Sequence, residues 1–293
     1  MPVTGVVPDW LLSAVAGATL FIIMFDLGLA IVPGQFRWVF TRPGLLARAL
    51  FCVLVAMPAL AWLVARLLDL PRAAEVGIML MAVAPGAPVA LRRSLGAGGH
   101  RSFAPALQIA VAVLAVASMP LWIAAFNEYY AGSATADPRD LARQVFIAQL
   151  LPLSLGMAMR RVAAARAAWL EPKLKRIGGA LLVLLLVLVL VNIWEVVVSA
   201  GLRVSLAIVL VTTLALMVGH ALGGPDPATR TATAISTAVR NPGLALLVAT
   251  LNAASPAIIG AILAYFVIAA LTVIPYIAWR RRAVATAAAP TDA

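Results

Sequence analysis

The sequence predicts an all-α integral membrane protein with nine transmembrane helices, arranged as an inverted repeat around two broken helices. Three observations support this fold class. The chain is 64% apolar and 11% charged, whereas a soluble domain is about half apolar and about a quarter charged. Its apolar residues gather in runs of about twenty, the length that spans a bilayer. Two of these runs are interrupted near their middle by proline and glycine.

Nine apolar runs are long enough to span a membrane. In chain order they lie at residues 10–32, 44–66, 72–98, 103–126, 141–159, 177–198, 202–223, 228–253 and 256–279. The longest polar interruptions, 127–140 and 160–176, are too short for a soluble domain. We therefore expect one polytopic membrane domain over 1–293, with half-repeats at 10–126 and 141–279. A cytoplasmic tail follows at 280–293, disordered after Arg282.

The basic residues predict the orientation. Lys and Arg number 22 against 11 Asp and Glu, but the apolar runs are too long for the solvated surface of a nucleic-acid-binding protein. With the N-terminus outside, the inside segments carry sixteen Lys and Arg, and the outside segments carry Arg66, Arg72, Arg139, Arg143 and Arg203. The positive-inside rule favours this topology, with the C-terminus in the cytoplasm. We expect a multi-pass protein of a bacterial inner membrane, with the lipid bilayer and no nucleic acid as partner.

The third and the eighth run are broken. The third contains APGAPVALRR (Ala84–Arg93) and the eighth contains VRNPGLA (Val239–Ala245). Freed backbone groups that face lipid cost several kcal/mol each, so such breaks are tolerated only where they are buried in protein or line a wet cavity. Each break lies in the second-to-last helix of its half, and the two helices run in opposite directions. This pattern is typical of an inverted repeat with a binding site at the midplane.

Four segments resemble the bile acid:sodium symporter family, within the bile/arsenite/riboflavin transporter superfamily. They are MFDLGLAI, AMPALA, APGAPVALRR and RNPGLA, and their order and spacing match the family from about residue 20 to 280. The chain is similar to the nine-helix form of the family. The resemblance implies a core domain that holds the crossing helices and a panel domain that moves against it.

The positions at which the resemblance places sodium ligands have lost most of their side-chain oxygens. These positions are Val53, Ala90, Leu91, Ala104 and Ser236, the last in place of a glutamate shared by two ions. Gln108 stands at one more of them, and Arg240 replaces the glutamine of the second break. A guanidinium about 4 Å from a sodium ion would repel it by several kcal/mol even at an effective dielectric of 20. We expect no sodium site, no other metal ion and no cofactor.

A substrate site is expected around the two breaks. Its candidate residues are Arg240, Asn241, Pro242, Gly243, Pro85, Gly86, Ala87, Pro88, Asp26, Gln108 and Arg92. A charge at the centre of a span costs roughly 2.5–3.5 kcal/mol. Arg240 therefore either attracts an anionic substrate or fills a former ion site and caps helix carbonyls. Asp26 either pairs with Arg92, Arg93 or Arg240 or carries a proton, and Arg92 either snorkels to the inner interface or attracts anions there.

These features favour a secondary transporter of a small organic anion that works by alternating access and without sodium. Two alternatives stay open. One is a sodium- or proton-coupled carrier of the same superfamily, similar to the auxin efflux carriers, with protons as the coupling ion. The other is a non-transporting sensor or scaffold with the transporter fold. The sequence contains no Gly-rich phosphate loop and no Cys/His cluster, so we expect neither an enzyme nor an ATP-driven transporter.

Overall fold

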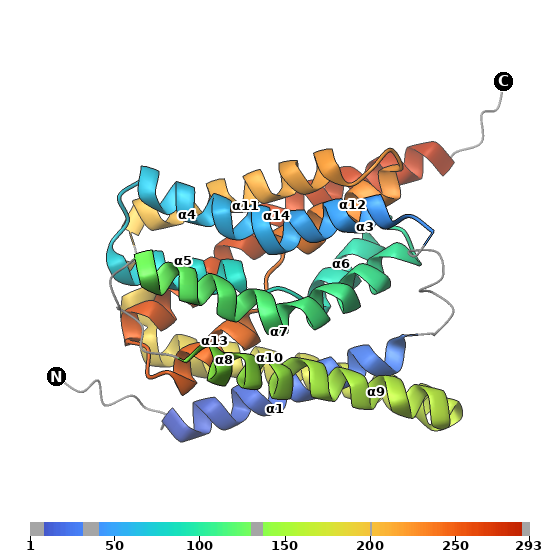
Figure 1. Cartoon of the computed structure of the whole chain (residues 1–293), viewed down its shortest axis with the longest axis horizontal. Coiled ribbons are helices and arrows are strands. Elements are labelled where there is room, and N and C mark those ends of the chain that lie inside the picture. The colour runs from blue at the N-terminus through green and yellow to red at the C-terminus, as the bar shows by residue number, and fades with distance from the viewer. Residues whose placement is uncertain (1–8, 32–40, 130–136, 200, 289–293) are drawn as a thin grey trace.

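The computed structural model describes residues 9–31, 41–129, 137–199 and 201–288, and in this part of the chain every regular element is a helix (Figure 1). The α-helices are α1 (Asp9–Ala30), α3 (Pro43–Phe51), α4 (Met57–Leu67), α5 (Arg72–Val83), α6 (Pro88–Gly96), α7 (Phe103–Tyr129), α8 (Pro138–Val145), α9 (Leu151–Val162), α10 (Ala164–Ser199), α11 (Gly201–Leu222), α12 (Pro227–Ala238), α13 (Pro242–Leu251) and α14 (Pro256–Ala288). Two π-helical turns, η2 (Cys52–Ala56) and η3 (Phe146–Leu150), join α3 to α4 and α8 to α9.

Several helical segments, some of them made of consecutive elements, are long and apolar enough to cross a membrane. Among the described residues there are six, at Pro43–Leu67, Phe103–Glu128, Pro138–Val162, Gly201–Leu222, Pro227–Leu251 and Pro256–Thr286. A seventh results if α5 and α6 form one broken span, and α1 contributes a shorter apolar helix at Ala14–Ala30. The chain is therefore a multi-pass membrane protein. The count of nine spans stays a prediction.

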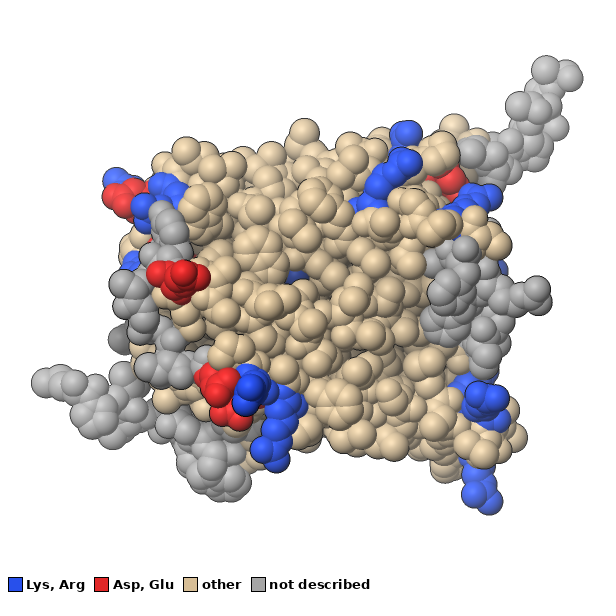
Figure 2. Space-filling model, viewed as in Figure 1, with Lys and Arg blue, Asp and Glu red and all other residues tan. Residues whose placement is uncertain are grey.

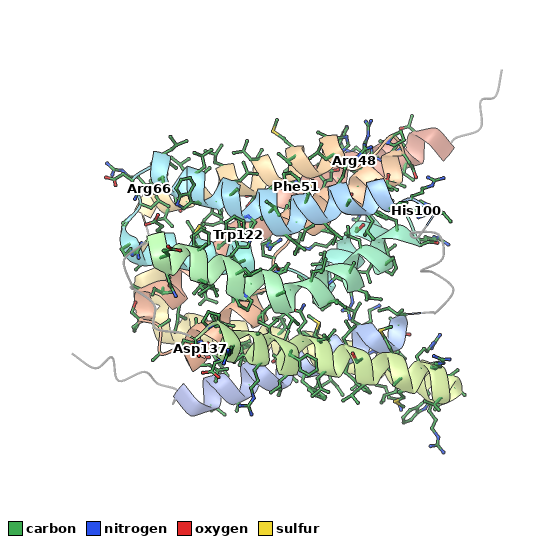
Figure 3. All side chains as sticks on the ribbon, in the orientation of Figure 1. Arg48, Phe51, Arg66, His100, Trp122 and Asp137 are labelled. Carbon is green, nitrogen blue, oxygen red and sulfur yellow. The ribbon has the colours of Figure 1, made fainter. Side chains whose placement is uncertain are left out.

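The charged side chains divide between the two ends of the molecule. On the face shown in Figure 2 they gather toward both ends of the long axis, and a broad band separates them in which the only charge visible is a small blue patch in a hollow near the centre. Figure 3 places Arg66 and Asp137, from segments expected outside, toward one end, and Arg48 and His100, from segments expected inside, toward the other. The band between them has the character of a membrane-facing surface. Which end faces the cytoplasm stays a prediction.

Two segments are more helical than expected. Most of the predicted polar interruption at 160–176 belongs to α10, which begins at Ala164. The predicted disorder after Arg282 is wrong as far as Ala288, because α14 extends to that residue; residues 289–293 lie outside the described part. Both segments are rich in alanine and other strong helix formers, whose intrinsic propensity outweighs their polar or low-complexity appearance.

The two halves of the chain share an irregular helix. The π-helical turns η2 and η3 are each followed by a proline at the second position of the next helix, Pro58 and Pro152. Proline removes a helix N–H and its ring clashes with the carbonyl four residues earlier, and a π turn accommodates this mismatch by adding a residue. The shared feature is compatible with an internal repeat. The inverted symmetry and the division into core and panel domains stay predictions.

The broken helices lie between two groups of helices. α1, α9 and α10 pack against one another, whereas α11 packs against α4, α12 and α14. In Figure 1 the first group lies along the lower edge, and α4, α11 and α12 lie along the upper edge, with α5, α6, α7 and α13 between them. α14 runs from the left of the view to the upper right and also packs against α5 and α10. The interrupted segments that join α5 to α6 and α12 to α13 therefore meet in the interior.

Candidate functional site: the crossing of two broken helices

The first break separates α5 from α6 at residues 84–87. The two helices are bent by 67° relative to each other. Pro85 and Pro88 cause the interruption, because proline lacks an N–H and drives the residue before it out of the α conformation. Ala84 and Ala87 accordingly have ψ angles of 80° and 121°. Gly86 between them has φ +81°, a left-handed conformation that glycine adopts without a steric penalty.

The second break separates α12 from α13 at residues 239–241, and it crosses the first. Val239 and Asn241 are extended, with ψ angles of 112° and 94°, and Pro242 opens α13. The backbone N–H of Asn241 donates to the carbonyl oxygen of Ala84 at 3.0 Å. The side-chain oxygen of Asn241 accepts from the N–H of Leu244 at 3.2 Å and so caps the N-terminus of α13. We call residues 84–87 and 239–241 together the crossing.

Arg240 lies in the crossing with 3% of its surface exposed. Its guanidinium donates to four backbone carbonyls. Nε donates to Met81 at 3.3 Å, and Nη1 donates to Val53 at 3.2 Å and to Thr237 at 3.4 Å. Nη2 donates to the carbonyl oxygen of Ala82. The acceptors belong to the last turns of α5 and α12 and to η2, so the structure shows the carbonyl capping that is one of the two roles expected for Arg240.

Each of these carbonyls has lost its ordinary helical partner. The partner of Thr237 would be the N–H of Asn241, which bonds Ala84 instead. Met81 stands four residues before Pro85, which has no N–H, so its carbonyl accepts instead from the N–H of Ala84 at 3.2 Å as well as from Arg240. The partner of Ala82 lies past the end of α5. The N–H of Met57, four residues after Val53, donates to Cys52 in the π turn. The sequence around the breaks therefore creates the group of acceptors that Arg240 fills.

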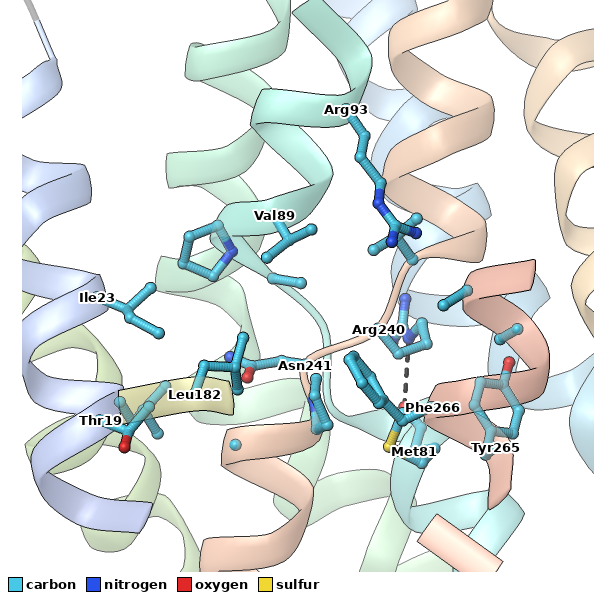
Figure 4. A pocket seen from close by; sticks show the side chains of 18 of the residues that line it. Thr19, Ile23, Met81, Val89, Arg93, Leu182, Arg240, Asn241, Tyr265 and Phe266 are labelled. Carbon is cyan, nitrogen blue, oxygen red and sulfur yellow. Dashed lines mark hydrogen bonds between the residues drawn. The ribbon is translucent and has the colours of Figure 1, made fainter. Parts of the chain in front are cut away.

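A cavity of about 250 Å³ lies beside the crossing (Figure 4). Arg240, Asn241, Pro242 and Gly243 line it on one side, and Ala87, Pro88 and Val89 at the start of α6 line it on another. The N-termini of α6 and α13 therefore both border it, and helix N-termini attract anions. The side-chain nitrogen of Asn241, a residue with 3% of its surface exposed, has no hydrogen-bond partner among the described residues. Figure 4 shows Arg93 reaching from α6 toward the same space.

The remaining candidate residues lie away from the cavity lining. Pro85 and Gly86 belong to the first break, and a Cβ atom at Gly86 would lie 3.7 Å from the side-chain nitrogen of Gln108 and 3.2 Å from that of Gln149. Gln149 donates to the carbonyl of Ala112 at 3.3 Å, while the side-chain nitrogen of Gln108 is buried and finds no partner within the described ranges. Gln108 therefore lies behind the crossing.

Asp26 and Arg92 form an ion pair. Nη2 of Arg92 lies 2.6 Å from Oδ2 of Asp26, with side-chain exposures of 40% and 5%. The structure thus selects Arg92 among the three partners expected for this carboxylate. The other oxygen of Asp26 is buried and has no partner in the part of the chain that the structure describes. Both residues lie outside the cavity lining, whereas Arg93 is part of it.

Much of the cavity wall was not predicted. α1 contributes Thr19, Leu20 and Ile23, α10 contributes Leu182 and Val183, and α14 contributes Tyr265, Phe266, Ala269 and Ala270. In an apolar helix the residues that face a cavity look like those that face lipid, so the sequence offers little signal for them. Tyr265 is the exception, because a fully buried tyrosine in an apolar span normally needs a polar partner.

Comparison with known families gives one match. The family model of the sodium bile acid symporter family matches residues 18–200. The chain belongs to this family. Its members are membrane transporters, which are not enzymes, and no curated protein matches the chain. The matched residues include the first break, whereas Arg240 and the second break follow them in the chain.

The family name implies sodium, but the residues of this member do not suit that ion. A sodium ion needs several oxygen ligands, as hard cations do, and the side chains of Val53, Ala90, Leu91 and Ala104 carry no oxygen. The backbone oxygens of Val53, Met81, Ala82 and Thr237 accept from the guanidinium of Arg240. In the described part of the chain, no group of three or more His, Cys, Asp and Glu could hold a metal ion.

Proposed function

We propose that this protein is a secondary transporter of a small organic anion and works by alternating access without sodium. The observation that carries the proposal is the charge arrangement at the crossing. Two helix N-termini and the Asn241 amide border a cavity of about 250 Å³, with the guanidinium of Arg240 beside them. No Asp or Glu is among the described residues that line it. An anion could therefore offset the field of Arg240 and of both helix ends.

The size and lining of the cavity support a small substrate. A volume of about 250 Å³ is below the roughly 300–1,000 Å³ of pockets that enclose drug-sized ligands. The proposed site comprises Arg240, Asn241, Pro242, Gly243, Ala87 and Pro88, with Arg93 added. A carboxylate or sulfonate would accept hydrogen bonds from the N–H groups at the helix starts, and the apolar walls would hold a short carbon skeleton.

The proposed movement is a displacement of α1, α9 and α10 against the remaining helices, as panel and core domains. It is supported by the position of the cavity, whose walls come from α1 and α10 on one side and from α6, α13 and α14 on the other. A relative shift of these groups would expose the cavity to one side of the membrane and then to the other. We further propose a bacterial inner membrane, with the N-terminus outside and the C-terminus in the cytoplasm.

A proton-coupled carrier is the second candidate function. Asp26 favours it, because this buried carboxylate has one oxygen without a partner and is paired with an arginine that is 40% exposed. A proton could reach a carboxylate of this kind when the exposed partner moves away. In this candidate Asp26 would take up and release the coupling proton during the cycle.

The test is flux in proteoliposomes that contain the purified protein. A panel of labelled carboxylates and sulfonates is offered at the outside, and empty liposomes serve as the control. We expect saturable uptake of at least one small anion that unlabelled substrate competes away. A proton gradient that drives accumulation would favour the second candidate function. If the reconstituted protein is folded and uptake of every compound equals that of empty liposomes, the transport function is contradicted and a sensor or scaffold is favoured.

A further inference from the structure

We infer that the crossing contains a carbonyl-lined cation site, and that its occupant is the protein's own guanidinium. In this view Arg240 is a tethered cation that replaces a dissociable ion. The site itself stands on the hydrogen bonds of Arg240, whereas its consequence for coupling rests on the proposed transport function.

The acceptors around Arg240 have the composition of a cation site. Four carbonyl oxygens from three separate elements, α5, α12 and η2, converge on one buried guanidinium. Each of the four stands where a break, a proline or a π turn has removed the ordinary helical N–H. Without a cation at their centre, several buried carbonyls would lack partners, at a cost of about 1–3 kcal/mol each.

The helix ends divide the charge of the crossing into two sides. The C-terminal turns of α5 and α12, which carry partial negative charge, supply three of the oxygens that bind Arg240. The N-termini of α6 and α13, which carry partial positive charge, border the cavity. A cation on the first side therefore offsets the partial negative charge of α5 and α12, and an anion on the second side offsets the partial positive charge of α6 and α13.

Tethering the cation changes the expected coupling. A free ion must bind before it can offset the carbonyls, and it can leave on either side of the membrane. Arg240 cannot leave and cannot lose its charge, so the crossing keeps its cation-bound arrangement throughout the cycle. Anion binding should then need no added cation, and flux should follow the electrochemical gradient of the substrate alone.

The test uses an Arg240→Ala variant and small cations as probes, with thermal stability in detergent as the readout. Removing the side chain should lower the Tm and leave the carbonyls of Val53, Ala82 and Thr237 without the donor that Arg240 supplies. Millimolar guanidinium or methylguanidinium should then recover roughly half of the lost Tm or more, because a ligand that binds only the folded state stabilises it. Sodium that produces the same recovery would also support a cation site.

The control is Arg281→Ala. Arg281 is exposed and donates to the single carbonyl of Gly96 at 2.9 Å, so its loss should leave no enclosed site, and neither cation should stabilise that variant. Tetramethylammonium at the same ionic strength, which donates no hydrogen bond, should have no effect on Arg240→Ala. A folded Arg240→Ala variant that no cation stabilises would overturn the inference.

A second pair of variants covers the case in which Arg240→Ala does not fold. Arg240→Lys keeps the charge, and Arg240→Met keeps most of the volume without it. The inference expects Arg240→Lys to be clearly more stable than Arg240→Met, and equal or reversed stabilities would overturn it. Failure here is separable from failure of the proposed function, since cation rescue is measured without transport and flux is measured on the wild-type protein.

Discussion

The backbone N–H of Asn241 donates to the carbonyl oxygen of Ala84 at 3.0 Å, and this hydrogen bond joins the two broken helices. It removes Asn241 as a partner for Thr237, whose carbonyl then accepts from Arg240. The side chain of Asn241 simultaneously caps α13 through Oδ1 and leaves its nitrogen free beside the cavity. One residue therefore connects the crossing, the cationic side and the proposed anion site.

Asn241→Asp distinguishes the two roles of the Asn241 side chain, whose oxygen caps α13 and whose nitrogen is a hydrogen-bond donor beside the cavity. A carboxylate can still accept from Leu244 and is an equally good N-cap, so stability should change by less than about 0.5 kcal/mol. The amide donor is replaced by a negative charge beside the cavity, so anion affinity should fall by about tenfold or more. Substrate binding by calorimetry, alongside Tm, checks both effects. Unchanged affinity in the folded variant would remove Asn241 from the site.

The contact between α1 and α9 depends on two glycines. A Cβ atom at Gly28 would collide with the carbonyl oxygen of Leu153 and lie 2.9 Å from Cα of Gly156, and one at Gly156 would collide with the carbonyl oxygen of Phe25. Gly28→Ala or Gly156→Ala should therefore destabilise the protein by about 1–3 kcal/mol, since backbone cannot yield as a side chain can. Thermal unfolding in detergent measures the effect.

Gly17→Ala is the matched control for these variants. A Cβ atom at Gly17, in the same helix α1, would meet nothing within 4 Å. Alanine should instead stabilise the helix by up to about 1 kcal/mol through its higher helix propensity. If all three substitutions destabilised the protein equally, the close approach of α1 and α9 would be wrong.

Trp122 secures one of the carbonyls that the π turn frees. Pro58 has no N–H to offer Leu54, four residues earlier, and Nε1 of Trp122 donates to that carbonyl at 2.7 Å. Trp122→Phe keeps an aromatic ring but leaves the carbonyl unpaired, so stability should fall by about 1–3 kcal/mol. Trp169→Phe, at a position with 64% of its surface exposed, should change it by less than about 0.5 kcal/mol. A similar loss in both variants would show that the hydrogen bond contributes nothing measurable.

The ion pair between Asp26 and Arg92 distinguishes a structural carboxylate from a proton carrier. Asp26→Asn removes the negative charge of the pair. The changes in the free energy of unfolding caused by Asp26→Asn and by Arg92→Gln should therefore not add up to the change in the double variant, and the difference should be about 1–2 kcal/mol. If Asp26 has a structural role only, we expect the same pH dependence of flux in Asp26→Asn and in the wild type. A pH dependence that disappears in Asp26→Asn would instead favour the proton-coupled carrier.

The sequence predicts the breaks well but not the walls around them. Proline and glycine at Pro85, Gly86 and Pro242 have local conformational effects that act in any context, and a buried charge at Arg240 requires helix-end partners. The acceptor at Val53 depends on a π turn, which no short pattern specifies. The contributions of Ile23 and Leu182 to the cavity depend on how uniformly apolar helices rotate and pack. These contributions are set by tertiary packing. The sequence therefore predicts the residues of the two breaks, but not the residues of the surrounding helices that complete the cavity wall.

Transport without sodium is tested most directly by substrate uptake into proteoliposomes with the sodium outside replaced by potassium or by choline. We expect equal initial rates and equal apparent affinity for the anion in all three salts, because Arg240 already occupies the carbonyls of the crossing. A rate or an affinity that rises with millimolar sodium, and falls again when sodium is withdrawn, would contradict it.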